Sequence, residues 1–234
     1  MTFSRFVLWT VRNSGTFSAR TGKRGRVVLL TGPSGAGKSR LAGRLHAAYG
    51  WPVIRLDDFY RDGVDPRLPT RKLGGTTIVD WDDPASWDGD AAVAALEHLI
   101  RTGSVEVPVY DIARSAAVSA ARVELDPDAL VVAEGIFAAE IVTDLRTAGL
   151  LHSAWCVRHA RWVTFLRRLV RDLAERRKPP LLLWRRGVAL WRAEPAIVAR
   201  MERLGATSAR PAHVERALRA ALRPLAPGLT GTGD

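Results

Sequence analysis

The sequence of 234 residues lacks the features that mark several large classes of protein. A single cysteine, Cys156, excludes an internal disulfide, and no Cys/His cluster has the spacing of a zinc site. No run approaches the roughly 18 apolar residues that a membrane span needs. The first 25 residues are basic, and their longest apolar stretch, residues 6–9, is too short for a signal-peptide core. These absences predict a cytoplasmic protein without a membrane span.

What is present is an average globular composition with an uneven distribution of charge. Apolar residues make up 47% of the chain and charged residues 25%, which predicts a single folded domain at residues 26–225. Residues 1–56 carry ten Lys/Arg and no Asp/Glu, residues 57–157 carry eight and eighteen, and residues 158–203 carry thirteen and four. Without a recognised docking motif, this alternation disfavours nucleic acid as a partner. It suits a site for polyphosphate and metal, although a solvated arginine-rich surface would give the same pattern.

Hydrophobic periodicity predicts strands that alternate with helices. Short apolar runs at residues 26–31, 53–56, 105–110, 129–133 and 154–157 are typical of strands, and helices are predicted at 38–49, 89–101, 161–176, 181–204 and 212–222. The intervening residues 58–90, interrupted by proline and glycine, are predicted to form a long ordered loop. Residues 1–25 are expected to be a basic extension and residues 226–234 a flexible tail. The pattern predicts an α/β fold with a parallel sheet covered on both faces.

The segment GPSGAGKS at residues 32–39 matches the phosphate-loop pattern GxxxxGK[ST] in full. It lies between a predicted strand and a predicted helix, which is the context that the motif requires. Glycines let successive backbone N–H groups point inward, and the helix N-terminus adds positive potential. Lys38 is expected to reach the β- and γ-phosphates, and the Ser39 hydroxyl to ligate Mg²⁺. The nucleotide site is therefore predicted to comprise Gly32, Ser34, Gly35, Ala36, Gly37, Lys38 and Ser39.

Acidic residues follow two of the predicted strands. Glu134 comes directly after the strand at 129–133, where a phosphate loop needs a carboxylate near its metal, although an acid pointing to water would show the same pattern. Asp57 and Asp58 come directly after the strand at 53–56. Either could accept the proton of an acceptor hydroxyl, and the other would then be a turn or helix-capping residue.

Together with these residues, five ordered segments resemble the uridine kinase and phosphoribulokinase family of P-loop kinases. The segments are GPSGAGKS at 32–39, LDDFY at 56–60, VDWDDPASWD at 79–88, VPVYD at 107–111 with VVAEGIF at 131–137, and RRLVRDLAERRK at 167–178. The resemblance implies a five-stranded parallel sheet flanked by helices, with a helical lid at about 168–180. It also implies an ATP- and Mg²⁺-dependent kinase that phosphorylates the 5′-hydroxyl of a nucleoside, with uridine or cytidine as the leading candidates.

The resemblance further implies roles for individual residues. Asp57 is the expected catalytic base, and Ser39 and Glu134 are the expected Mg²⁺ partners. The nucleoside is expected to contact Tyr60, Trp81, Asp82, Tyr110 and Ser115, with Trp81 and Tyr110 as core aromatics in the alternative. On the lid, Arg171 and Arg176 are expected to neutralise the transferring phosphoryl group, and Arg168 and Lys178 to contact ATP. A solvated helix surface is the alternative for these four.

The chain departs from the family pattern in three places. Ser115 stands where the family has a pyrimidine-reading histidine, and Ile112 stands where it often has an aromatic residue, which leaves the base identity open. After residue 180 the family's closing strand is not recognisable. The helix around Trp184 and Trp191 is expected to pack on the core or support the lid, with a partner or a membrane surface as the alternative.

Two other functions are compatible with the same residues. A kinase of another alcohol or of a sugar phosphate is one, and basic residues near Asp57, for which Arg61, Arg67, Arg71 and Lys72 are candidates, would favour a phosphorylated acceptor. A non-catalytic nucleotide-binding regulator is the other, although the complete set of Lys38, Ser39, Asp57 and Glu134 favours catalysis. The patterns do not encode an oligomeric state, and a homo-oligomer is compatible with them.

Overall fold

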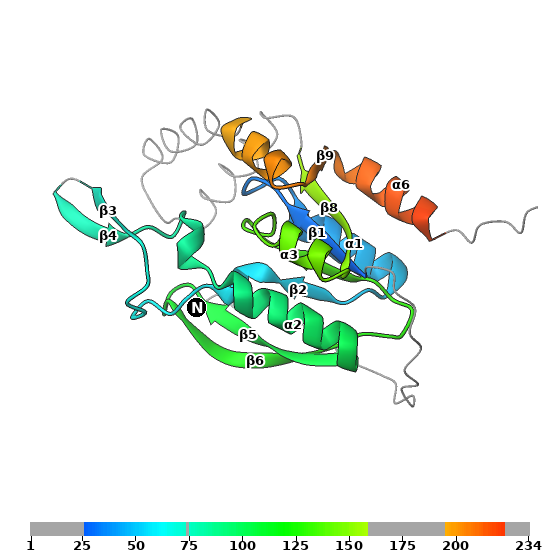
Figure 1. The fold of residues 1–234 in the computed structure, drawn as a ribbon, viewed down its shortest axis with the longest axis horizontal. Coiled ribbons are helices and arrows are strands. Elements are labelled where there is room, and N and C mark those ends of the chain that lie inside the picture. Colours follow the sequence, from blue (N-terminus) through cyan, green and yellow to red (C-terminus); the bar gives the residue numbers. More distant parts are fainter. Residues whose placement is uncertain (1–25, 74, 159–194, 223–234) are drawn as a thin grey trace, which may run out of the picture.

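One parallel sheet forms the centre of the molecule (Figure 1). The computed structural model describes residues 26–73, 75–158 and 195–222, and all structural statements refer to these. The sheet has five strands in the order β2-β7-β1-β8-β9. Their bounds are Val27–Thr31 for β1, Val53–Arg55 for β2, Val131–Glu134 for β7, Leu151–Val157 for β8 and Thr207–Ala209 for β9. The predicted α/β fold with a five-stranded parallel sheet is confirmed.

Helices cover both faces of the sheet because alternate residues of its central strand point to opposite sides. Val27 and Leu29 pack with α2 (Gly89–Thr102), α3 (Val142–Thr147) and helical residues 195–203. Val28 and Leu30 pack with α1 (Lys38–Tyr49) and α6 (Pro211–Ala221). All four of these β1 side chains are 0% exposed, so β1 is buried from both sides.

Local signals explain why α1 and α2 begin and end where the sequence predicted. The side chain of Asp88 accepts a hydrogen bond from the N–H of Ala91 and so caps the start of α2. At the end of α1, Gly50 adopts a left-handed conformation with φ of 72°, and its N–H donates to the carbonyl oxygen of His46.

The strand predicted at residues 105–110 exists, but it does not join the parallel sheet. β5 (Ser104–Asp111) pairs antiparallel with β6 (Ala116–Glu124), and the two form a separate hairpin. Figure 1 shows α2 lying along this hairpin, with β6 as its outer strand. Only Val107 of β5 is fully buried, and most of β6 is exposed, which is the pattern of a sheet covered on one face.

The long loop predicted at residues 58–90 is also corrected by the structure. It follows a 3-10 turn, η1 (Leu56–Phe59), and contains a second hairpin of β3 (Thr70–Leu73) and β4 (Thr76–Val79) and the 3-10 turn η2 (Pro84–Ser86). The β3–β4 hairpin projects from the body of the molecule (Figure 1). Its residues are exposed or half-buried, so the hairpin adds no layer to the core.

The closing strand that the sequence did not reveal is present as β9. Its three residues pair in parallel with Trp155, Cys156 and Val157 of β8. The sequence Thr-Ser-Ala carries no apolar run, so hydrophobicity could not mark it as a strand.

Several predicted segments lie outside the described residues. These are the basic extension at 1–25, the helix at 161–176, the lid at about 168–180, the segment around Trp184 and Trp191, and the tail at 226–234. Of the helix predicted at 181–204, residues 195–203 are described and are helical. Among the described helices, none is long and apolar enough to cross a membrane.

The packing of α2 against the sheet gives a first testable expectation. Leu96 is 0% exposed and belongs to the cluster that joins α2 to β1 and β7. Replacing it by alanine removes buried methyl groups and leaves a cavity, so Leu96→Ala should lower the free energy of unfolding by about 2–5 kcal/mol. Urea denaturation measures this value. The exposed neighbour Glu97 provides the control, because Glu97→Ala should change stability by less than about 0.5 kcal/mol. Equal effects of the two variants would contradict the packing of α2.

Candidate active site

The phosphate loop connects β1 to α1 and runs close against the edge of the sheet. Gly32, Gly35 and Gly37 have φ values of 142°, 79° and 90°, a region that side chains disfavour. A Cβ atom on Gly32 would lie 2.4 Å from the carbonyl oxygen of Val157, at the end of β8. Glycine at position 32 is therefore required by close backbone contact as well as by conformation.

Lys38 lies over this loop at the first position of α1. Its side chain is buried, and its ammonium group donates hydrogen bonds to the carbonyl oxygens of Gly32 at 2.9 Å and Pro33 at 3.4 Å. The first turn of α1 contains no acidic residue that would oppose an anion there. The helix N-terminus and this lysine place positive potential beside the loop, an arrangement that can hold phosphate groups.

Ser39 and Glu134, the predicted metal partners, are brought together. Glu134 ends β7 with only 5% of its surface exposed, and the Ser39 hydroxyl donates a hydrogen bond to its carboxylate. Burial raises the pKa of the Glu134 carboxyl, while the Ser39 hydrogen bond and the charge of Lys38 oppose the rise. The described residues contain no cluster of three or more His, Cys, Asp or Glu that could hold a metal. This donor set fits Mg²⁺, which is commonly held by one or two protein oxygens together with water and phosphate oxygens.

The two aspartates of η1 face different neighbours. Asp57 accepts a hydrogen bond through Oδ1 from the backbone N–H of Ile136 at 2.9 Å, and its charge contributes to the raised pKa of Glu134. A Cβ atom on Gly135 would lie 2.9 Å from that same Oδ1 atom, so the glycine lets Asp57 approach β7. Asp58 instead contacts β5, because its Oδ1 atom accepts from the N–H of Tyr110 at 3.3 Å. Of the pair, Asp57 is the one beside Glu134 and the residues that follow β7.

Aromatic side chains continue the site beyond Asp57. The ring centroid of Tyr60 lies 5.9 Å from those of Trp81, Tyr110 and Phe137. The Tyr60 hydroxyl donates to the carbonyl oxygen of Trp81 at 3.2 Å. Burial raises the pKa of Tyr60, and the charge of Asp57 raises it further. The structure therefore brings three predicted substrate residues together and adds Phe137, which the motif VVAEGIF contains but which sequence reasoning did not single out.

A cavity of about 710 Å³ adjoins the aromatic group between the two hairpins. Trp81 and Ser115, two of the predicted substrate residues, line it. Ser115 has φ of 49°, a left-handed conformation that is uncommon for residues other than glycine. The other lining residues were not predicted: Asp62, Gly63, Val64, Ile78, Val79, Arg114 and Ala116. The sequence did contain a signal for the β3–β4 hairpin, which forms one wall of the cavity. Gly74-Gly75 separates two short runs of strand-forming residues.

Asp82 is the exposed one among the predicted substrate residues. Its side chain is 77% exposed and lies 4.0 Å from Arg71, and like Tyr60 and Tyr110 it does not line the cavity. Its charge nevertheless contributes to the raised pKa of Tyr60.

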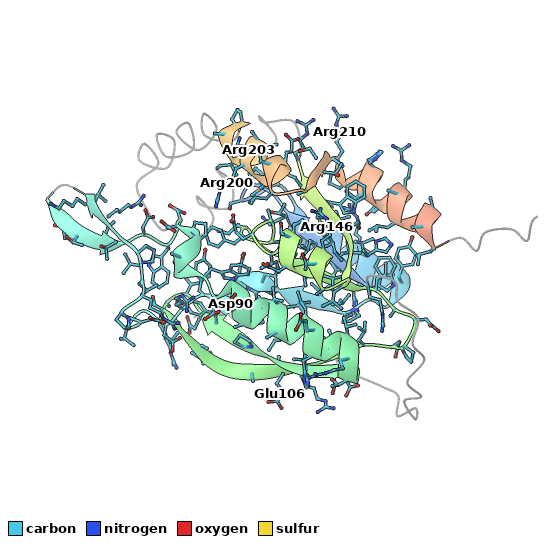
Figure 2. All side chains as sticks on the ribbon, viewed as in Figure 1. Asp90, Glu106, Arg146, Arg200, Arg203 and Arg210 are labelled. Carbon is cyan, nitrogen blue, oxygen red and sulfur yellow. The ribbon has the colours of Figure 1, made fainter. Side chains whose placement is uncertain are left out.

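The predicted lid residues Arg168, Arg171, Arg176 and Lys178 lie outside the described residues. The helical residues 195–203 are tied to the segment after β7 by an ion pair of 2.9 Å between Arg200 and Glu140. Figure 2 shows Arg200 and Arg203 on the helical residues 195–203.

Comparisons with known proteins agree with this arrangement. Residues 27–179 match the model of the phosphoribulokinase / uridine kinase family. The chain is 28% identical over 162 residues to a uridine kinase of Limosilactobacillus reuteri, covering 68% of this chain and 70% of that one. It is 29% identical over 157 residues to a uridine kinase of Clostridium perfringens, covering 66% and 71%. A solved structure described provisionally as a fructose transport system kinase from Silicibacter sp. TM1040 has the same fold, with a TM-score of 0.54 and 21% identity over 82% of this chain and 92% of that one.

The close contact of Gly32 gives a second testable expectation, with a matched control in the same helix-loop unit. Gly32→Ala forces a Cβ atom against the carbonyl oxygen of Val157 and should lower the free energy of unfolding by about 2 kcal/mol or more. Gly43 lies inside α1 with nothing within 4 Å of its Cβ position, so Gly43→Ala should raise stability by about 0.5–1 kcal/mol. Urea denaturation of both variants measures the difference. A Gly32→Ala protein as stable as the Gly43→Ala protein would show that the loop does not press on β8.

Proposed function

The chain belongs to the phosphoribulokinase / uridine kinase family of P-loop kinases, and we propose that it transfers the γ-phosphoryl group of ATP to the 5′-hydroxyl of a nucleoside. The observation that carries this proposal is the meeting of three predicted groups at one edge of the sheet. The phosphate loop with Lys38, the Ser39–Glu134 pair and Asp57 all lie where β1, β2 and β7 end. Uridine and cytidine are the leading candidate acceptors, and the relatives above are named uridine kinases.

The chemistry asked of these residues is positioning and charge stabilisation. The phosphate loop and Lys38 hold the phosphate chain, and Ser39 with Glu134 would hold Mg²⁺. A bound Mg²⁺ would neutralise charge on the β- and γ-phosphates. The hydrogen bond from the Ile136 N–H fixes the Asp57 carboxylate through one oxygen, which leaves the other for the acceptor hydroxyl. Asp57 then orients that hydroxyl and accepts its proton during transfer.

Three of the four basic residues that would favour a phosphorylated acceptor, all but Lys72, have carboxylate partners, which supports an acceptor without a phosphate group of its own. Arg61 lies 2.7 Å from Asp88, Arg67 lies 2.8 Å from Asp65, and Arg71 lies 3.6 Å from Asp80. Each of these guanidinium groups therefore has a carboxylate partner within the same region of the chain. A sugar phosphate would have to compete with those carboxylates, whereas a neutral nucleoside needs no cation.

The test of the proposed function is ADP release from Mg-ATP over a panel of nucleosides, pentose phosphates and pantothenate, with Asp57→Asn in parallel. Uridine or cytidine should support turnover, and Asp57→Asn should reduce it by about 10²–10⁴-fold because asparagine accepts no proton. The asparagine oxygen can still accept from the Ile136 N–H, so the variant should fold and bind ATP. Asp144→Asn, an exposed change on α3, is the control and should retain full turnover.

Two results would overturn parts of this proposal. Turnover with a pentose phosphate and none with nucleosides would replace the proposed acceptor and keep the kinase. ATP binding without turnover on any acceptor would favour the nucleotide-binding regulator.

The role of Glu134 gives a separate expectation. Glu134→Gln removes the anionic oxygens that Mg²⁺ prefers, so the Mg²⁺ concentration needed for half-maximal rate should rise by about 10–100-fold. The initial rate at saturating ATP, measured against Mg²⁺ concentration, gives this value. Glu140→Gln is the control, because the charged partner of Glu140 is Arg200 and not Ser39 or Lys38, so the change should leave the Mg²⁺ dependence unchanged. An identical Mg²⁺ dependence in the Glu134→Gln protein and the wild type would exclude Glu134 as a metal partner.

A further inference from the structure

The β5–β6 hairpin carries Tyr110 and Ser115 to the substrate side of the site, yet it is not a continuation of the five-stranded sheet. Its end is instead tied to the segment at residues 58–63, which follows Asp57 directly. The four hydrogen bonds run from Tyr110 N–H to Asp58 Oδ1 (3.3 Å), Tyr110 hydroxyl to Arg61 carbonyl (3.1 Å), Ala117 N–H to Asp62 Oδ1 (3.0 Å) and Gly63 N–H to Ser115 carbonyl (2.6 Å). The segment therefore sets where the hairpin lies relative to Asp57.

Asp58 is the buried carboxylate among these contacts. It is 8% exposed, and its Oδ2 atom lies 3.6 Å from Nε of Arg55 while its Oδ1 atom accepts from Tyr110. Burial raises the pKa of Asp58, and the charge of Arg55 opposes the rise. Burying a carboxylate is costly unless its oxygens have partners, so both contacts are needed to hold Asp58 in place.

The strand that Asp58 contacts is irregular at the same residue. Val109 pairs with Ser119 of β6, but Tyr110 pairs with Ala117, so Val118 is an extra residue on β6. A bulge of this kind bends the strand and redirects the side chains beside it. The N–H of Tyr110 donates to Asp58 at the bulge, and the Tyr110 ring lies with its centroid 5.9 Å from that of Tyr60.

We propose that Asp58 is a positioning residue for the acceptor, because its carboxylate fixes the bulged end of β5, and with it Tyr110, relative to Asp57. Asp57 faces β7 and Asp58 faces β5, so adjacent residues of η1 join the catalytic edge of the sheet to the acceptor hairpin. The effect on the acceptor rests on the proposed function, whereas the anchoring of the hairpin stands on the contacts alone.

The experiment compares Asp58→Ala and Asp58→Asn by hydrogen–deuterium exchange and by steady-state kinetics. Asp58→Ala removes the hydrogen bond to Tyr110, so exchange in peptides covering residues 104–117 should become faster. The KM for the acceptor should rise about tenfold, while the KM for ATP changes less than about twofold. Asparagine keeps an oxygen for the Tyr110 N–H, so Asp58→Asn should restore both readouts to within about threefold of the wild type.

Controls and contrary results separate this inference from the proposed function. Glu106→Ala also removes a carboxylate from β5, at an exposed position that does not line the cavity, and it should leave both the acceptor KM and the exchange unchanged. If Asp58→Ala does not fold, Asp58→Ser takes its place, since the shorter side chain also loses the reach to Tyr110. Unchanged exchange in residues 104–117 would overturn the proposal, as would equal loss of turnover in Asp58→Ala and Asp58→Asn. If the wild type phosphorylates no acceptor, the proposed function fails, and the exchange result still decides whether Asp58 holds the hairpin.

Discussion

The burial of one carboxylate, Glu134, is the constraint on which the site depends. It ends a strand that is covered on both faces, where an isolated negative charge would be strongly disfavoured. Ser39 donates to it and the charge of Lys38 favours its ionised form, so the residues that would contact phosphate and metal also stabilise the acid. Because the phosphate loop supplies both groups, the position of the loop and the charge of Glu134 are coupled. A divalent cation placed here would meet a carboxylate that has little competing water.

The two parts of the site at this edge of the sheet are held together by different kinds of contact. The proposed nucleotide side is built on the parallel sheet, where backbone contacts such as Gly32 against Val157 leave little freedom. The proposed acceptor side is built from two hairpins and the aromatic residues between them, held by side-chain hydrogen bonds and ion pairs. All kinases of this type bind the same phosphate groups, so rigid support suits that part of the site. Hairpins and loops are easier to vary, so they suit the part that selects the acceptor.

The sequence predicted the nucleotide side far better than the acceptor side, for a physical reason. A buried parallel strand is a short apolar run, and the phosphate loop has a fixed glycine pattern, so β1, β2, β7, β8 and α1 could all be recognised. The strand β9 was missed because pairing with β8, and not hydrophobicity, holds Thr-Ser-Ala in place. The hairpin partner of β5 was missed because most residues of β6 are exposed and carry no burial pattern. The contact of Asp58 with Tyr110 joins residues distant in sequence, and no local pattern encodes it.

The distribution of charge follows from the same division. The acidic block at residues 57–157 contains the acceptor side, and its arginines at 61, 67 and 71 are paired with aspartates of the same block. These ion pairs hold the loops around the pocket together. The acidic residues therefore have a structural role that the net charge does not reveal. The phosphate loop lies in the preceding block, which has no acidic residue at all, so no carboxylate of that block opposes the incoming phosphates. Among the described residues, the basic groups beside the phosphate loop and the acidic groups around the pocket therefore fall in different parts of the proposed site.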